Sequence, residues 1–296
     1  MLGMVKNNDV ESIAYDILKQ SKSLGVFPTP VDRIVQYSEL VVDSSIDLSV
    51  IPQNYFSKSI ESLKRALRKT RGALDRRKKK IYLDLTQGES RKNFIKLHEV
   101  GHEVLPWQRE LYEFFEDDEL SINIDTQDEF EFEANCFASS ALFQLDRYKE
   151  EMDKLPLEIG SPMALAKKFG SSQHASIRKY VDTSNKRCAL LVLEKETNGK
   201  LMGCEVRNYF QSSSFTKTFG NVIWEKNLSI KWPFVQDVYM RRRFHTEGQV
   251  AFNTKDKKLT TFTYHYFNNT FNTFVLIIPV GEKNYSRTSF YFKENL

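Results

Sequence analysis

Residues 90–107 read SRKNFIKLHEVGHEVLPW and have the pattern of one amphipathic helix. Apolar side chains, two histidines and a glycine recur every three or four positions, which is the spacing of one helix face. Pro106 supplies a stop, and Gly101 leaves room for another element to pack closely. The sequence therefore predicts a helix over about 90–105, with one face formed by Phe94, Leu97, His98, Gly101, His102 and Leu105.

Within this helix, residues 98–102 read HEVGH. Side chains at positions i and i+4 share a helix face, so His98 and His102 can bind one metal ion. The metal acidifies water, and Glu99 can accept the proton as the water attacks a peptide carbonyl. The pattern predicts a metal-dependent peptidase with Glu99 as general base. The alternative is ordinary polar residues on a helix, since the pattern arises by chance in roughly one chain in a hundred.

A catalytic zinc site normally has three protein ligands, so a third ligand is needed. Residues 125–143, DTQDEFEFEANCFASSALF, predict a helix that begins with Thr126 and Glu129 in capping-box spacing. Glu131 shares a face with small residues that permit close helix approach, whereas Glu133 is expected to point towards a solvent or hinge side. The sequence therefore favours Glu131 as the third ligand.

Several alternatives to this assignment stay open. Glu133 is the nearest one, and Glu131 could serve only to complement the positive end of its helix. More remote candidates for the third ligand are Glu110, Glu113 and Glu116. Asn135 is a candidate for orienting a histidine ligand, because such imidazoles donate their other N–H to an oxygen. The ligand types favour Zn²⁺, with Mn²⁺ as the alternative.

HEVGH, followed by ExxAN at residues 131–135 and then FAS, resembles the ImmA/IrrE family of zinc metallo-endopeptidases. The resemblance covers about residues 8–184, more weakly beyond 145, and includes the upstream strand IYLDL. It implies a zincin-like domain with a gluzincin-like site, in which the zinc ligands are His98, His102 and Glu131 and the catalytic base is Glu99. Members of that family cut a helix-turn-helix repressor, which relieves repression of mobile-element or stress-response genes.

The resemblance also implies a helix-turn-helix segment after the peptidase core and, in some relatives, a GAF-type sensor domain after that. Two features depart from the family pattern. Glu103, Pro106 and Trp107 stand where the family often has a hydrophobic turn and a further histidine, and ALFQLD replaces the usual Leu-Leu-Met-Pro. These differences concern the subfamily and the substrate more than the metal site.

The fold class expected from these features is α+β. Residues 1–150 are predicted to form a zincin-like, mainly helical metallopeptidase domain with a small sheet. Its other predicted elements are a helix over 9–24 that ends at Gly25, a helix that starts at Thr29 and Pro30, a helix around 53–71 and a strand over 78–85.

Residues 151–184 are predicted to form a helix-turn-helix-like segment, with two short helices broken at Gly170. Its basic side chains permit a DNA-binding interpretation, although packing or partner recognition is favoured; they are Lys167, Lys168, His174, Arg178 and Lys179. Residues 185–296 are expected to form a β-rich or α+β sensor or regulatory domain. Its predicted strands cover 188–194, 221–226, 260–267, 270–280 and 288–293.

A basic run from Lys64 to Lys80 holds ten Lys or Arg in seventeen residues. A solvated surface is the favoured interpretation, and an acidic partner or a nucleic acid is the alternative. Because the run leads into a presumed edge strand at 80–85, it could also flank a substrate cleft. In the C-terminal part, the basic residues at 241–245 and the aromatic residues at 264–266 are interpreted as ordinary surface and strand positions rather than a ligand pocket.

The bulk composition predicts a folded cytoplasmic protein. The hydrophobic content is 41%, the net charge is +4, and no apolar run approaches the ~20 residues that cross a bilayer. The N-terminal residues show no signal-peptide pattern, so no membrane partner is expected. Three cysteines without CxxC spacing indicate reduced thiols rather than disulfides or a cysteine zinc site.

Three functions are compatible with these sequence features. The first is a zinc-dependent endopeptidase that cleaves a helix-turn-helix repressor. The second is a DNA-binding or ligand-sensing regulator whose metal site is structural or degenerate. The third is a toxin-like partner of a neighbouring gene product. Glu99 favours the first, because a purely structural zinc site does not need a general base.

Overall fold

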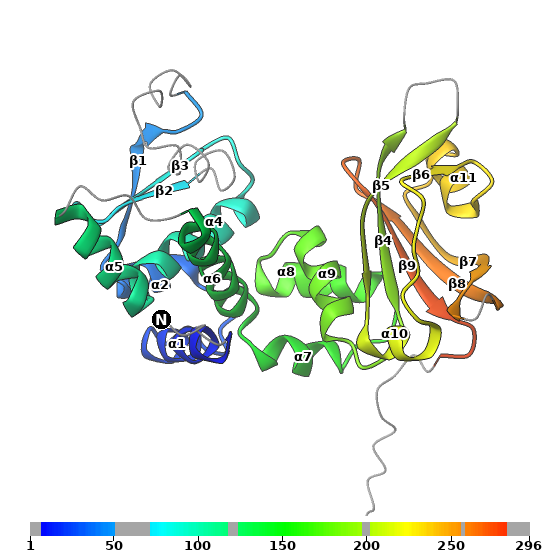
Figure 1. Cartoon of the computed structure of the whole chain (residues 1–296), viewed down its shortest axis with the longest axis horizontal. Coiled ribbons are helices and arrows are strands. Elements are labelled where there is room, and N and C mark those ends of the chain that lie inside the picture. The colour runs from blue at the N-terminus through cyan, green and yellow to red at the C-terminus, as the bar shows by residue number, and fades with distance from the viewer. Residues whose placement is uncertain (1–6, 51–71, 118–123, 197–201, 256–257, 283–296) are drawn as a thin grey trace, which may run out of the picture. The chain divides into compact units, whose positions relative to one another are not determined.

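The computed structural model describes residues 7–50, 72–117, 124–196, 202–255 and 258–282. The chain divides into two compact units, each with its own core (Figure 1). The first comprises Met1–Tyr148 with Lys167–Ser172, and the second comprises Lys149–Ala166 with Gln173–Leu296. Helices and sheets both contribute to the fold, which is α+β as predicted. The helix expected around 53–71 and the strand expected at 288–293 lie outside the described residues, and the boundaries near 150 and 184 stay predictions.

The first helix, α1, spans Asn7–Gln20 and ends earlier than predicted. Lys22 adopts a left-handed backbone conformation with φ 55°. The backbone N–H of Ser23 then reaches back to the carbonyl of Leu18 at 2.8 Å, which is the hydrogen bond of a Schellman helix end. Helix α1 therefore ends before Gly25, the residue at which the sequence predicts its end.

The second helix, α2, spans Val31–Tyr37. Its N-cap is Pro30, whereas the sequence predicts Thr29 in that position. The Thr29 hydroxyl instead donates to the backbone carbonyl of Leu142 at 2.8 Å. Thr29 thus connects two segments that are far apart in the sequence.

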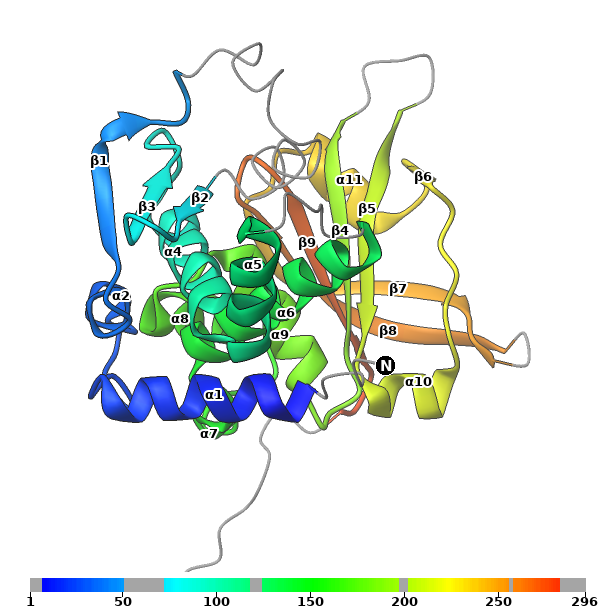
Figure 2. The ribbon, with the colours of Figure 1, turned by 60° about the vertical axis from the view of Figure 1, so that its left-hand side comes forward.

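The two helices predicted to carry the metal ligands are confirmed as helices. The first is α4, Glu89–Val104, and the second is α6, Ile124–Phe143. Because α6 begins at Ile124, Thr126 lies inside the helix rather than at its N-cap. Figure 1 shows α4 and α6 side by side, and Figure 2 shows α1 running across the unit below them.

The segment after Pro106 is helical, which corrects the prediction that Pro106 supplies a stop. Pro106 is the first residue of α5, Pro106–Asp117. Proline is well tolerated at a first helical position, because the N–H that it lacks has no partner there in any helix. A further helix, α7, covers Asp146–Met152. The chain therefore turns a corner between α4 and α5 instead of leaving the helical region.

The small sheet of the first unit has the strand order β1-β3-β2. The predicted strand is β3, Lys80–Leu83. It is parallel to β1, Val41–Asp47, and antiparallel to β2, Gly72–Asp75. β3 is therefore the central strand of the three and not the presumed edge strand. Among the described residues, β1 and β2 are the two edge strands of this sheet.

Two short helices follow the first unit's main body, as the sequence predicts. They are α8, Gly160–Phe169, and α9, Gln173–Thr183. Gly170 lies between them with φ 74°, a conformation that glycine adopts without steric cost. The Ser176 hydroxyl on α9 donates to the carbonyl of Pro162 at 2.7 Å and joins the two helices.

The second unit is built on a six-stranded antiparallel sheet with the order β6-β5-β4-β9-β8-β7. The predictions at 188–194, 260–267 and 270–280 are confirmed as β4, β8 and β9. The prediction at 221–226 is wrong, because the adjacent strand begins at Asn227. In chain order the elements are β4 (Ala189–Glu196), β5 (Gly203–Gln211), α10 (Ser213–Phe219), β6 (Asn227–Ser229), α11 (Pro233–Tyr239), β7 (Phe244–Asn253), β8 (Leu259–Asn268) and β9 (Thr273–Pro279).

The two faces of β4 pack against different helices. Leu191 belongs to the core that also holds Phe215 of α10 and Phe234 of α11. Leu190 points the other way, because successive strand residues alternate between faces, and it is also buried. Helix α9 packs against β4 and β5. An apolar run such as ALLVL is typical of a strand covered on both faces.

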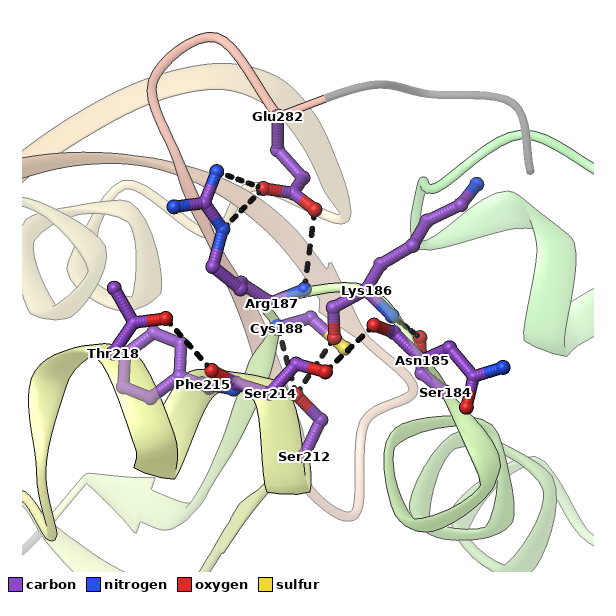
Figure 3. A network of polar contacts seen from close by, with 10 residues as sticks. All are labelled: Ser184, Asn185, Lys186, Arg187, Cys188, Ser212, Ser214, Phe215, Thr218 and Glu282. Atoms are coloured by element: carbon purple, nitrogen blue, oxygen red, sulfur yellow. Dashed lines mark hydrogen bonds and ion pairs between the residues drawn. The ribbon is translucent and has the colours of Figure 1, made fainter. Parts of the chain in front are cut away.

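A network of hydrogen bonds centred on Ser212 fastens the start of β4 to α10 (Figure 3). The fully buried Ser212 hydroxyl donates to the carbonyl of Lys186 at 2.7 Å. The same oxygen accepts the backbone N–H groups of Cys188 and Phe215, each at 3.2 Å. Ser212 therefore caps α10 and also pairs backbone groups of the preceding segment.

Replacing Ser212 by alanine is expected to lower the free energy of unfolding by ~1–3 kcal/mol, because buried backbone groups lose their partner. Chemical denaturation measures the change. The matched control is Ser214→Ala on the same helix, where an exposed hydroxyl donates to the carbonyl of Asn185 and its loss is expected to cost less than ~0.5 kcal/mol. Equal losses in the two variants would contradict this role of Ser212.

Within the ranges described, no helix combines the length and the apolar content needed to cross a membrane. None of the three cysteines, all of which the structure describes, forms a disulfide bond. Cys188 and Cys204 are buried and Cys136 is half-buried.

Candidate metal centre

The two histidines of HEVGH lie where α4 packs closely against α6. A Cβ atom built on Gly101 would lie 3.2 Å from the Cα of Ala134 and 3.2 Å from Cδ1 of Phe137. Only glycine permits this approach without a shift of the neighbouring helix. As predicted, Gly101 is the position at which another element packs against the motif. The contact brings Glu131 of α6 to the face of α4 that carries both imidazoles.

Three side chains converge at this contact. The Nε2 atoms of His98 and His102 lie 3.1 Å apart, with the two rings nearly perpendicular at 87°. The carboxylate of Glu131 spans the pair: Oε2 lies 3.4 Å from Nε2 of His98, and Oε1 lies 3.4 Å from Nε2 of His102. These ligand atoms could hold a metal ion.

The donor set fits a small divalent cation. Ligands at ~2.1 Å from a tetrahedral ion are ~3.4 Å from one another, which matches the separations of 3.1 and 3.4 Å. Among the described residues, Oε2 of Glu131 and Nδ1 of His98 are buried without a hydrogen-bond partner. Buried polar atoms without partners are costly, and a cation would satisfy the carboxylate oxygen.

Burial and the two imidazoles act in opposite directions on Glu131. Burial raises the pKa of its carboxyl, but the adjacent His102 and His98 outweigh that effect and hold the pKa well below its usual range. Glu131 is therefore a carboxylate at neutral pH. A carboxylate beside two imidazole nitrogens is a set of ligands that zinc prefers.

Glu99 is buried next to the same group, with 4% of its surface exposed. Burial raises the pKa of the Glu99 carboxyl to about 7, with Glu131 adding to the rise and His98 and Arg76 opposing it. Strand β2 covers it closely, since a Cβ on Gly72 would lie 2.9 Å from Oε1 of Glu99. The strand at the edge of the small sheet thus runs directly past the candidate general base.

Glu133 does not point towards solvent, which corrects the prediction. It is buried, and its Oε2 accepts hydrogen bonds from Nε1 of Trp107 at 2.7 Å and from Nε2 of Gln108 at 2.6 Å. Gln108 in turn places its Oε1 2.8 Å from Nδ1 of His102. The sequence does not predict these contacts of Trp107 and Gln108, because a stop at Pro106 leaves no helix to carry them. A proline followed by a helix-forming segment was the signal that could have revealed them.

The structure does not bring Asn135 to a histidine. Its Nδ2 donates to the carbonyl of Glu131 on its own helix at 2.7 Å. Of the remote glutamates, Glu110 is exposed and lies outside the metal-binding group. The side chains of Glu113 and Glu116 lie outside the described part of the chain.

The described part of the basic run is used for contacts within the first unit. Arg76 donates to the carbonyl of His102 at 2.9 Å, and its guanidinium lies 3.8 Å from the centre of the Tyr112 ring. Lys79 pairs with the buried Glu103. The turn between β2 and β3 is therefore fastened to the last turn of α4. Residues 64–71 of the run lie outside the described residues.

Two basic residues of α8 and α9 also make contacts within their own units. Lys168 lies 4.9 Å from the centre of the Phe27 ring. Arg178 pairs with Asp182 and lies 4.8 Å from the centre of the Phe210 ring. These contacts stabilise the fold and give no support to a DNA-binding surface.

Zinc is expected to raise the free energy of unfolding of this protein by ~2.7 kcal/mol at a zinc concentration one hundred times the dissociation constant. Replacing Glu131 by glutamine should remove most of that gain, because a charged ligand is lost. Thermal unfolding with zinc and with a chelator measures it. Glu110→Gln, at an exposed glutamate of α5, is the control that should respond like the wild type. A full zinc response in Glu131→Gln would contradict the ligand assignment.

No protein-family model matches the chain, and no curated protein matches it. Among solved structures, the chain is similar to one described as a Mycobacterium tuberculosis transcriptional regulator. The TM-score is 0.49 and the sequence identity is 12%, over 92% of this chain and 76% of that one. A likeness of this size carries no argument about activity, so a functional proposal has to start from the residues around His98 and His102.

Proposed function

We propose that the protein is a zinc-dependent endopeptidase of zincin-like fold whose site lies in the first unit. The observation that carries the proposal is the convergence of His98, His102 and Glu131, with the buried Glu99 between the two histidines in sequence. The ligands would be the two Nε2 atoms and the Glu131 carboxylate. Zn²⁺ suits imidazole and carboxylate ligands, and Mn²⁺ is the alternative metal.

The number of ligands favours a catalytic site over a structural one. Structural zinc sites are usually closed by four protein side chains, whereas catalytic sites use three and keep one position open. In the part of the chain that the structure describes, the group contains three such side chains. This count, together with an adjacent buried carboxylate, disfavours a regulator whose metal site is structural or degenerate.

The residues of the chain divide the chemistry between them. A bound zinc ion would supply Lewis acidity to water and to the scissile carbonyl. Glu99 would accept the proton of the attacking water and later deliver it to the leaving amine. The charge of Arg76 lowers the pKa of Glu99, and the charge of Glu99 raises the pKa of Tyr112. The edge strand β2 offers main-chain groups to an extended peptide.

The substrate and the regulation rest on the family resemblance of the sequence. We propose a helix-turn-helix transcriptional repressor as substrate, so that hydrolysis changes transcription, for instance in a stress response. The second unit would then act as a regulatory or sensor unit of GAF type. Its sheet is covered by α9 on one face and by α10 and α11 on the other.

The direct test is incubation of the metal-free protein with Zn²⁺ or Mn²⁺ and helix-turn-helix repressors encoded near its gene. Mass spectrometry would report cleaved peptide bonds, and a proteome-derived peptide library would extend the search to other sequences. The expected result is cleavage at one or a few bonds that a chelator abolishes. Absence of cleavage with both Zn²⁺ and Mn²⁺ would refute the peptidase proposal.

A further inference from the structure

Gln108 is the residue that connects the candidate metal ligand His102 to a buried carboxylate. It is fully buried, and its amide makes three contacts. Its Nε2 donates to Oε2 of Glu133 at 2.6 Å and to the carbonyl of Phe130 at 3.1 Å. Its Oε1 lies 2.8 Å from Nδ1 of His102. The three partners come from α4 and α6, and Gln108 itself comes from α5.

The chemistry of these partners fixes the orientation of the Gln108 amide. The Phe130 carbonyl can only accept a hydrogen bond, and the Glu133 oxygen already accepts one from Trp107. A flipped amide would place its oxygen against both of them, so the NH₂ group must face α6. The amide oxygen that then faces His102 can only accept. Nδ1 of His102 must therefore carry a hydrogen.

This constraint determines which nitrogen of His102 is available to a metal. With a hydrogen on Nδ1, the neutral ring keeps its lone pair on Nε2, the atom that lies 3.4 Å from Glu131. His98 has no equivalent support, because its Nδ1 is buried without a partner among the described residues. Among the described residues, a hydrogen bond at Nδ1 thus orients the ring of His102 but not the ring of His98.

We infer that Gln108 and Glu133 form a positioning relay that holds His102 in the Nδ1–H tautomer, ready to bind a metal through Nε2. Gln108 sets the tautomer and the ring orientation. Glu133 holds the amide in place, and its carboxylate supports the positive charge that the ring gains with a cation. The inference rests on the metal site of the proposed function, but it concerns ligand preparation and does not depend on hydrolysis.

The first test measures zinc affinity in the full-length protein by competition with a chromophoric chelator. Gln108→Met keeps the length and volume of the side chain but removes both hydrogen-bonding ends, and it should weaken zinc binding by ~10- to 100-fold. Glu133→Gln keeps an oxygen for both donors and removes only the charge, so it should weaken binding by ~10-fold or less.

The matched control is Trp107→Phe. It deletes the other donor to the same Glu133 oxygen and leaves the Gln108 contact with His102 in place. Its zinc affinity should equal that of the wild type. A loss as large as that of Gln108→Met would overturn the inference, because general packing of α5 would then explain both results.

The second test reads the tautomer without metal. In metal-free protein labelled with ¹⁵N-histidine, NMR at alkaline pH should show His102 with its hydrogen on Nδ1, with the signal assigned through His102→Gln. Glu133→Gln should keep that tautomer, and Gln108→Met should lose it. An unchanged tautomer and an unchanged zinc affinity in Gln108→Met would overturn the relay.

The two proposals fail in different ways. Wild-type protein that passes the zinc and NMR tests but cleaves no peptide would refute the peptidase function and leave the relay standing. Cleavage by the wild type, together with an unchanged zinc affinity and an unchanged tautomer in Gln108→Met, would refute the relay and leave the peptidase function standing.

Discussion

Replacing Glu99 by glutamine is expected to slow peptide hydrolysis by ~10²- to 10⁴-fold and to leave zinc binding intact. The amide has nearly the shape of the carboxyl group but cannot accept the proton of the attacking water. Glu99 is not one of the three converging side chains, so its replacement would remove the proposed base without removing a proposed ligand. The rate is measured on a cleavable repressor or peptide, and the zinc response by thermal unfolding.

The matched control for Glu99→Gln is Glu89→Gln on the same helix. Glu89 pairs with Lys92 and its side chain is 78% exposed, so the change should affect neither the rate nor the zinc response. Hydrolysis at equal rates by the wild type and Glu99→Gln would remove Glu99 from the mechanism. Loss of zinc binding in Glu99→Gln would show that this residue is needed to build the site.

Replacing Gly101 by leucine is expected to lower the free energy of unfolding by ~3 kcal/mol and to abolish the stabilisation by zinc. The Cβ atom alone already meets Ala134 Cα and Phe137 Cδ1 at 3.2 Å. The Ala134 atom is backbone, so α6 has to move as a whole to make room. Since Glu131 is carried by α6, the shift would separate it from His98 and His102.

A graded series of glycine variants sharpens this expectation. Gly101→Ala should be much milder, because its single added carbon needs a shift of only a few tenths of an ångström and alanine favours the helix by ~1 kcal/mol. Gly88→Ala, at the N-cap of α4 with no atom within 4 Å of the added carbon, serves as control. Chemical denaturation and zinc titration measure all three. A stable, zinc-binding Gly101→Leu protein would show that the contact of α4 with α6 is not needed.

The part of the site that follows from local periodicity could be predicted from the sequence. The spacing of His98 and His102 on one helix, and of Glu131 among small residues on another, is a property of each helix alone. The position of Glu133 could not be obtained in this way. The helical period places it away from Glu131, but only the tertiary fold shows that α5 covers that side. A helical pattern tells which residues share a face and not what lies against it.

The second unit shows the same division between local and tertiary information. β8 and β9 were predictable because β-branched and aromatic residues dominate them. The expected strand at 221–226 failed because aromatic packing, and not strand pairing, organises it: Trp224 contacts the rings of Tyr209 and Trp232, while Ile223 is 94% exposed. In β7, Val250 and Phe252 alternate with exposed residues, and this pattern of period two is typical of a strand with one buried face.

The corner between α4 and α5 has a consequence for the order of folding. His102 and Gln108 are six residues apart, whereas Gln108 and Glu133 are separated by 25. Contacts between close neighbours in the chain lose little loop entropy and form early. The half of the site on α4 and α5 should therefore assemble before α6 docks with Glu131. A metal ion that needs Glu131 as a ligand can bind only after α6 has docked, so we expect zinc to slow unfolding more than it changes the folding rate.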